Sequence, residues 1–259
     1  CIRDSLVTDF RVVIPARYGS TRLPGKPLID LAGKPMIVRV VEQVMRSDAN
    51  DIVVAIDDER VEHAVKATGA RTVMTDANHV SGSDRVMEVA SKNNWESDEL
   101  IVNVQGDEPL IPPMIVNQVA DLLADGRHDV ATLYATMDER SDVFDPNVVK
   151  LTATTAGSAL YFSRAPVPWS RGDFDEGEQG EIGADWKRHI GIYAYRLSAL
   201  QAFVALPRGR LESAESLEQL RFLEHGYSIA VGEAMCEVPA GVDTQVDADR
   251  VISRLREAS

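Results

Sequence analysis

Short runs of Val and Ile that alternate with helix-like segments restrict the fold of this chain more than any other feature. Four such apolar runs occur in the first half, at residues 10–14, 52–56, 71–74 and 100–104. Apolar residues recur at helical spacing between and after these runs, at 36–45, 61–65, 86–90 and 115–123. Continuous apolar strands separated by helices are typical of a parallel sheet covered on both faces. The pattern therefore predicts an α/β fold with a doubly wound, mostly parallel sheet.

The pattern changes after about residue 130. Strand-like segments then follow one another without helices of comparable strength, at 148–154, 159–162 and 190–195. We expect these segments to form an antiparallel insertion, an arrangement that can pair subunits. Between them, residues 171–185 contain six acidic residues and one basic residue, which predicts a solvated, mobile loop.

Helical spacing resumes in the last quarter of the chain. It predicts one helix at 198–206 and another near 215–225, where Gly226 is a suitable stop. Thr244 and Asp247 have the spacing of a capping box that would begin a last helix. We find no internal repeat and no linker between domains, so we expect residues 1–259 to form a single domain.

Charge and cysteine content exclude several classes of protein. The chain has 27 Lys and Arg residues against 41 Asp and Glu, a net charge of −14, which argues against broad nucleic-acid binding. Cys1 and Cys236 are the only cysteines, too few for a disulfide framework or a thiolate zinc site. No apolar run approaches the ~20 residues that span a bilayer, and Arg3, Asp4 and Asp9 interrupt any signal-peptide pattern. We therefore expect a cytoplasmic protein without a membrane partner, although the first residue is not Met and leaves the true start open.

The segment at 15–27, directly after the first predicted strand, contains three prolines, two glycines and several cations. It does not match a Walker A loop, because five residues separate Gly19 from Gly25 and Pro27 follows Lys26. It also lacks the Gly-x-Gly-x-x-Gly of a dinucleotide-binding fold. The segment nevertheless lies at the carboxyl end of a strand, where open α/β sheets bind ligands.

The charge of this loop favours an anionic ligand. From residue 17 to residue 35 it carries Arg17, Arg22, Lys26 and Lys34 against Asp30 alone. Guanidinium groups bind phosphate oxygens in pairs, and an ammonium neutralises charge as a point. A solvated basic loop is the alternative, but such a loop would not need prolines and glycines to fix its path. We therefore predict a phosphate-binding loop.

Carboxylates at a second strand end suggest a metal site. Asp107 and Glu108 follow the fourth predicted strand, and Mg²⁺ is usually held by one or two protein carboxylates together with phosphate and water. Asp107 is the preferred ligand, since Glu108 could turn inward or cap the next helix. Asp243, in a loop before the last predicted helix, is the candidate for a second ligand. From the residues alone, helix capping is the favoured explanation of Asp243.

The loop at 15–27 closely resembles the nucleotide loop of the 3-deoxy-manno-octulosonate cytidylyltransferase family. The resemblance continues in the family's order through seven further segments, at 81–85, 103–109, 146–150, 161–164, 189–193, 217–221 and 241–244. Two departures are mild. Ser83 and Asp84 replace the usual Thr-Glu, and the loop at 171–185 is unusually acidic.

This resemblance implies a nucleotidyltransferase-like variant of the Rossmann fold. Residues 10–130 would form the nucleotide-binding half, and residues 131–259 the half for sugar binding and dimerisation. The implied reaction transfers CMP from CTP to the anomeric hydroxyl of 3-deoxy-D-manno-octulosonate (Kdo) and releases pyrophosphate. Mg²⁺ would be the cofactor, the protein would be a homodimer, and the product would supply lipopolysaccharide synthesis in the cytoplasm.

The resemblance also implies roles for individual residues. Catalysis would fall to Lys26, Arg17, Arg22 and Asp107. Nucleotide binding would involve those four with Ala16, Ser20, Ser83 and Gln105. The Mg²⁺ ligands would be Asp107 and Asp243. Sugar binding would fall to Arg85, Gln105, Arg164, His189, Tyr193, Glu218 and Gln219.

Residue type alone leaves some of these roles open. His189 could be a structural histidine at the start of a strand, Tyr193 could belong to the core, and Glu218 and Gln219 could face solvent. A sister cytidylyltransferase that acts on a sialic acid-like sugar or 8-amino-Kdo is an alternative function. A non-catalytic nucleotide-sugar sensor would be expected to lack one metal carboxylate. A GT-A glycosyltransferase would be expected to show Asp-x-Asp at a strand end, which 105–107 does not.

Overall fold

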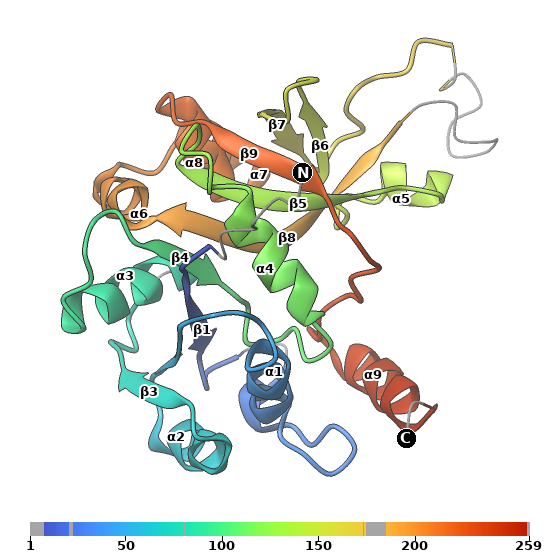
Figure 1. Ribbon diagram of the computed structural model, residues 1–259. Helices are drawn as coiled ribbons and strands as arrows, with labels where there is room; N and C mark the ends of the chain where they lie inside the picture. The colour runs from blue at the N-terminus through green and yellow to red at the C-terminus, as the bar shows by residue number, and fades with distance from the viewer. Residues whose placement is uncertain (1–7, 21–22, 80, 173, 175–184, 258–259) are drawn as a thin grey trace, which may run out of the picture.

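The computed structural model describes residues 8–20, 23–79, 81–172, 174 and 185–257. Within these residues a nine-stranded sheet lies between helices on both faces (Figure 1). The main strand order is β3-β2-β1-β4-β8-β5-β9. The four strands predicted in the first half are all present, as β1 (Arg11–Ala16), β2 (Asp51–Ile56), β3 (Arg71–Met74) and β4 (Leu100–Asn103). They pair in parallel, which confirms the doubly wound α/β fold.

Alternate residues of these strands pack on opposite faces of the sheet. On β1, Val12 and Ile14 belong to one buried cluster, and Val13 belongs to the other. The first cluster includes helices α1 (Met36–Val44), α2 (Glu59–Val65) and α4 (Pro113–Asp121). The second includes α3 (Gly82–Lys92), α6 (Leu197–Ala205) and α8 (Gln219–Glu224). Both faces of β1, β2 and β4 are therefore largely buried, as their continuous apolar sequence predicts, whereas β3 at the sheet edge is partly exposed.

Strand β8 (Lys187–Arg196) lies inside the main sheet and pairs antiparallel with both β4 and β5 (Val130–Thr136). The strands expected as a separate insertion are thus partly merged with the core. The hairpin of β6 (Lys150–Ala153) and β7 (Ala159–Ser163) branches from β8 outside the main strand order. Strand β9 (Ile229–Glu233) pairs in parallel with β5 and is the last strand of the main sheet order.

Several short elements were not predicted from the sequence. They are the strands β5 and β9, the helices α5 (Arg140–Phe144) and α7 (Arg210–Glu215), and the 3₁₀ turns η1 (Lys26–Leu28) and η2 (Lys66–Thr68). The stop predicted at Gly226 is confirmed by its φ of +83°. Most of the acidic segment 171–185 lies outside the described residues. No helix within the described part of the chain is both long and apolar enough to span a bilayer.

Helix α9 (Gln245–Glu257) packs against the loop that follows β1, far away in the sequence. The Thr244 hydroxyl accepts a hydrogen bond from the Asp247 N–H, and the Asp247 carboxylate accepts one from the Thr244 N–H, which confirms the predicted capping box. Val242, Ala248 and Val251 join Leu23 and Leu31 in one buried cluster. This docking places the loop before α9 at the carboxyl ends of β1 and β4.

Candidate active site

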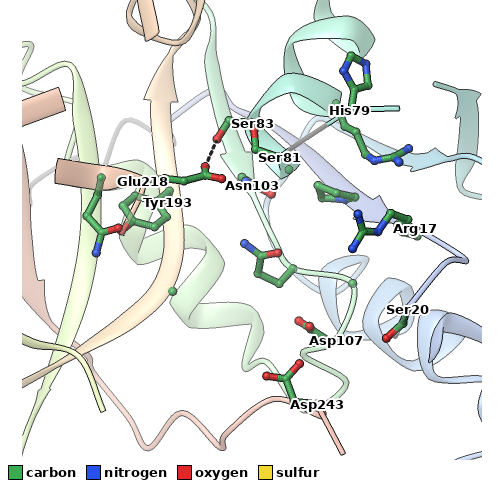
Figure 2. A pocket seen from close by; sticks show the side chains of 18 of the residues that line it. Arg17, Ser20, His79, Ser81, Ser83, Asn103, Asp107, Tyr193, Glu218 and Asp243 are labelled. Carbon is green, nitrogen blue, oxygen red and sulfur yellow. Dashed lines mark hydrogen bonds between the residues drawn. The ribbon is translucent and has the colours of Figure 1, made fainter. Parts of the chain in front are cut away.

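A cavity of about 530 Å³ opens where β1 and β4 end (Figure 2). Its walls come from the loop after β1, the start of α3, the loop after β4, the middle of β8 and the segments at 216–219 and 243. Ligands of open α/β sheets bind at this edge, outside the carboxyl ends of the strands. The residues predicted from sequence that line it are Ala16, Arg17, Ser20, Lys26, Ser83, Arg85, Gln105, Asp107, His189, Tyr193, Glu218, Gln219 and Asp243.

Asp107 and Asp243 face one another across the lower part of the cavity (Figure 2). The Lys26 ammonium bridges them, with Nζ 2.5 Å from Asp107 Oδ2 and 2.8 Å from Asp243 Oδ1. Backbone pairing fixes this approach, because the Val242 N–H donates to the Asp107 carbonyl at 2.9 Å. One cation thus already contacts both carboxylates, and the oxygen donors are of the kind that Mg²⁺ prefers. The two aspartates therefore fit a magnesium site.

The electrostatics of Lys26 reflect this position. Burial lowers the pKa of its ammonium, but the two aspartates outweigh that effect and raise the pKa above its ordinary value. Lys26 therefore carries its charge at neutral pH. The Asp243 carboxylate accepts a hydrogen bond from this ammonium, while Thr244 and Asp247 cap α9. The capping box of α9 is thus formed by Thr244 and Asp247, and the metal-ligand role of Asp243 stays a prediction.

Glu108 turns inward beside this pair. Burial, followed by the charge of Asp107, raises the pKa of the Glu108 carboxyl to about 8. Its Oε2 atom is buried and has no hydrogen-bond partner among the described residues. The raised pKa favours the neutral form of the Glu108 carboxyl in the metal-free protein, so Asp107 and Asp243 remain the preferred candidates for ligands.

The loop after β1 presents only part of its charge to the cavity. Arg17 and Ser20 line the cavity wall (Figure 2), and Gly25 adopts a φ of +66° that glycine accommodates best. Lys34 instead pairs with Glu42, with Nζ 2.6 Å from Oε1, on the exposed surface. Arg22 lies outside the described residues. The cationic contribution seen here comes from Arg17 and Lys26.

A buried ion pair stabilises the loop after β1. Arg85 and Asp57, with side chains 3% and 7% exposed, pair at 2.9 Å. The other oxygen of Asp57 accepts a hydrogen bond from the Tyr18 N–H at 2.8 Å, and Arg85 also donates to Thr75 Oγ1 at 2.7 Å. The Arg85 guanidinium is thus engaged within the protein, although its side chain forms part of the cavity wall.

The opposite wall suits a polyhydroxylated ligand. Three buried polar atoms on residues that line the cavity have no hydrogen-bond partner among the described residues, namely Asn103 Oδ1, Tyr193 Oη and Gln219 Nε2. Ser83 Oγ donates to Glu218 Oε2 at 3.2 Å, a contact visible in Figure 2. The cavity walls desolvate the Glu218 carboxyl, which raises its pKa despite this hydrogen bond. Buried polar atoms are rarely left unpaired, so a ligand with several hydroxyl groups would satisfy this wall.

Comparisons with known proteins agree with this geometry. A family model described as cytidylyltransferase matches residues 11–229. A 3-deoxy-manno-octulosonate cytidylyltransferase from Alcanivorax borkumensis is 51% identical over 248 residues, which cover 95% of this chain and 98% of the relative. The chain belongs to the 3-deoxy-manno-octulosonate cytidylyltransferase family.

Two further relatives of this cytidylyltransferase family agree. The Vibrio cholerae 3-deoxy-manno-octulosonate cytidylyltransferase is 50% identical over 243 residues, 94% of this chain and 96% of the relative. A solved structure of CMP:2-keto-3-deoxy-manno-octonic acid synthetase complexed with CTP superposes with a TM-score of 0.88 at 41% identity. That alignment covers 97% of this chain and 100% of the other.

Of the predicted site residues that the structure describes, Arg164 alone does not line the cavity. Its Nε donates to the Glu215 carbonyl at 2.7 Å, and its Nη1 donates to the Pro146 carbonyl at 2.8 Å. The Glu215 carboxylate in turn accepts hydrogen bonds from the Arg164 N–H and from Ser163 Oγ. Arg164 therefore holds the end of α7, next to the cavity segment at 216–219. A direct contact between Arg164 and substrate stays a prediction that this arrangement does not favour.

Sequence reasoning missed several polar residues of the wall, namely His79, Ser81, Asn103, Tyr195 and Ser216. His79 Nε2 lies 2.5 Å from Glu88 Oε2, so a carboxylate on α3 orients the imidazole. The Ser81 hydroxyl caps α3 and also faces the cavity. Asn103 ends β4 two residues before Gln105. The strand-end rule that found Asp107 could also have found Asn103, whereas nothing local marks His79.

Proposed function

We propose that this chain transfers CMP from CTP to the anomeric hydroxyl of Kdo and releases pyrophosphate. One observation carries the proposal. Lys26, Asp107 and Asp243 come from three distant segments and converge in a single contact at the cavity floor. Transfer of a nucleotidyl group needs this combination of a cation for the triphosphate and carboxylates for a metal ion. The family membership supplies the identity of the nucleotide and the sugar.

The residues of the first half would bind and orient the triphosphate. Arg17 would hold phosphate oxygens at the cavity wall, and Lys26 would stabilise charge on the departing pyrophosphate. Asp107 and Asp243 would hold Mg²⁺. When bound, this ion supplies Lewis-acid chemistry at the α-phosphate and lowers the pKa of the attacking hydroxyl. The ion pair of Arg85 with Asp57 would keep the loop in place during the reaction.

The residues of the second half would bind the acidic sugar. Tyr193 and Gln219 carry unpaired polar atoms at the cavity wall, and Glu218 is placed to accept hydrogen bonds from hydroxyl groups. Ser83 joins the Glu218 carboxylate to the start of α3. The two substrates would thus meet along a continuous polar wall, which favours an in-line approach of the hydroxyl to the α-phosphate.

A sister cytidylyltransferase for another acidic sugar is the second candidate. The loop after β1 does not discriminate between them, because triphosphate contacts are indifferent to the sugar. The presence of both Asp107 and Asp243 disfavours a non-catalytic sensor. Pyrophosphate release should therefore be measured with a panel of nucleoside triphosphates and acidic sugars, with and without Mg²⁺.

The proposal expects product only from CTP, Kdo and Mg²⁺ together. Faster turnover of a sialic acid-like sugar or 8-amino-Kdo than of Kdo would transfer the assignment to the sister activity. Asp107→Ala should abolish turnover with an unchanged circular dichroism spectrum. Turnover at the wild-type rate in that variant would overturn the assigned role of Asp107.

We further propose a homodimer that acts in the cytoplasm, where its donor CTP is available. Two large apolar side chains in the region of the hairpin support self-association, since Leu160 and Trp169 are 60% and 68% exposed. Light scattering after gel filtration should give the molar mass of a dimer. If β7 forms part of the interface, Leu160→Asp should lower the measured mass toward that of one chain.

A further inference from the structure

A bulge in β8 lies directly over a buried threonine of β5. Thr132 pairs with Tyr193, but the next residue, Leu133, pairs with Ile190. Gly191 and Ile192 are therefore extra residues on β8 at this point. Bulges are over-represented next to active sites, where they re-aim side chains, and this one lies between the two β8 residues of the sugar wall. Thr132 itself is 0% exposed.

The Thr132 hydroxyl contacts three groups of β8. Its Oγ1 lies 2.7 Å from the Ile192 carbonyl, 3.0 Å from the Ile190 carbonyl and 3.0 Å from His189 Nε2. A hydroxyl has one proton to donate and two lone pairs that accept. If that proton went to His189, two carbonyl oxygens would face the hydroxyl oxygen with no hydrogen between them. The proton therefore goes to a carbonyl, and Thr132 accepts a hydrogen bond from His189 Nε2–H.

This arrangement settles the state of the His189 ring. Burial, with a smaller effect of Arg188, lowers the pKa of the imidazole to about 3, so the ring is neutral at physiological pH. A neutral ring with its proton on Nε2 has an unprotonated Nδ1. Among the described residues no hydrogen bond to Nδ1 is present. The rings of Phe162 and Tyr193 contact the imidazole in edge-to-face and tilted arrangements, with centroids 5.2 Å and 5.4 Å away, and limit its rotation.

We infer that Thr132 is a positioning residue for the second substrate: its hydroxyl holds His189, a residue of the cavity wall, in the Nε2–H tautomer, which leaves Nδ1 unprotonated as a hydrogen-bond acceptor. The natural donor to this nitrogen is a hydroxyl group of a polyhydroxylated acid. The identity of that acid rests on the proposed function, but the tautomer does not. His189 then selects for a hydroxyl at one position of the sugar, because a group without a proton to donate leaves Nδ1 unpaired.

The tautomer can be observed directly in the whole protein. The chain contains five histidines, so ¹⁵N-labelled histidine gives few ring signals, and the signal lost in His189→Asn identifies His189. Long-range ¹H–¹⁵N correlation spectra distinguish a protonated Nε2 from a protonated Nδ1. The proposal expects an Nε2–H signal in the wild type and in Thr132→Ser, which keeps the hydroxyl. A protonated Nδ1 in the wild type would overturn the proposal without any variant being made.

Kinetics then test whether the tautomer matters. Thr132→Val removes the hydroxyl and keeps the branched shape. It should raise the KM for the sugar about tenfold and change the KM for CTP by less than about twofold, while Thr132→Ser restores the wild-type value. Thr136→Val is the matched control, because the one hydrogen bond of this exposed hydroxyl among the described residues is to Glu233 Oε1, at 2.8 Å. It should leave both KM values unchanged.

A double variant separates positioning from general damage. If Thr132 acts through His189, Thr132→Val should add no further loss to His189→Asn. Losses that add, or equal increases in both KM values, would show a structural role and overturn the proposal. Failure of the proposed function would look different: the wild type would show the Nε2–H tautomer but no turnover of Kdo with CTP.

Discussion

Replacing Lys26 with Met should have opposite effects on two measurements. The Lys26 ammonium lies between Asp107 and Asp243, where a divalent cation would bind. In the absence of nucleotide, a metal ion must therefore displace this ammonium. Lys26→Met removes the competing charge and keeps much of the side-chain length, so binding of a divalent cation to the free protein should tighten. Turnover should fall, because the same ammonium would stabilise the departing pyrophosphate.

The size of the effect follows from the exposure of the three groups. The Lys26 and Asp107 side chains are 14% and 32% exposed, whereas Asp243 is 48% exposed. A partly exposed ion pair contributes up to about 1 kcal/mol, and a better-buried charged hydrogen bond contributes about 1.5–3 kcal/mol. Removing the competitor should therefore improve the free energy of metal binding by about 1–3 kcal/mol, which is roughly 5- to 150-fold in Kd. The loss in kcat should reach about 100-fold or more.

Isothermal titration of Mn²⁺ into nucleotide-free protein measures the first effect, and pyrophosphate release measures the second. Lys34→Met is the matched control, since Lys34 lies on the same loop but pairs with Glu42 at the surface. It should change neither Kd nor kcat appreciably. If Lys26→Met bound Mn²⁺ no more tightly than the wild type, the two aspartates would not share their cation site with this ammonium.

Three further variants test other parts of the structure. Lys150→Met should lower the free energy of unfolding in urea by about 2–4 kcal/mol, because the fully buried ammonium donates to three backbone carbonyls. A loss below about 0.5 kcal/mol would contradict this expectation. Gly106→Ala should lower kcat at least about tenfold, since a Cβ there would lie 2.5 Å from the Pro15 carbonyl oxygen; wild-type turnover would refute the close approach. His189 has a folded pKa of about 3, below its ordinary 6.5, so its stabilising effect is complete above pH 6.5 and lost as the pH falls. The wild type should therefore lose about 2 kcal/mol between pH 6.5 and 5, and His189→Asn should lose distinctly less.

The parallel half of the fold could be predicted because local sequence reports burial. Continuous Val and Ile at 52–56 and 100–104 requires a strand that is covered on both faces. Strand β5 was missed because its alternation of Val, Ala, Thr and Tyr lacks that signal, and β9 contains Gly232. The place of β8 between β4 and β5 was also beyond local reasoning. Period and composition identify a strand, but its neighbours in the sheet depend on contacts far away in the sequence.

In the candidate site, too, local sequence predicts some residues, and contacts between distant segments determine the rest. The strand-end rule located Asp107, but Asp243 reaches it only because α9 docks on the loop after β1. The family resemblance, together with residue type, assigned Arg85 and Arg164 to the sugar. In the structure both guanidinium groups bind within the protein, Arg85 to Asp57 and Arg164 to backbone carbonyls. Residue type gives the chemistry that a side chain can perform, but not the partner that it meets.

The charge of the loop at 17–35 illustrates how such a pattern should be interpreted. A local excess of cations in an acidic chain indicated an anion site, and the loop does border the cavity. Lys34, however, is neutralised at the surface, and Lys26 contacts two carboxylates before any phosphate is present. Lys26, the cation of this loop that lies at the cavity floor, is therefore held by Asp107 and Asp243 in the ligand-free protein. An acidic chain can bind a polyanion in this way, because the carboxylates that hold Lys26 would accept a metal ion when the ammonium turns toward the triphosphate.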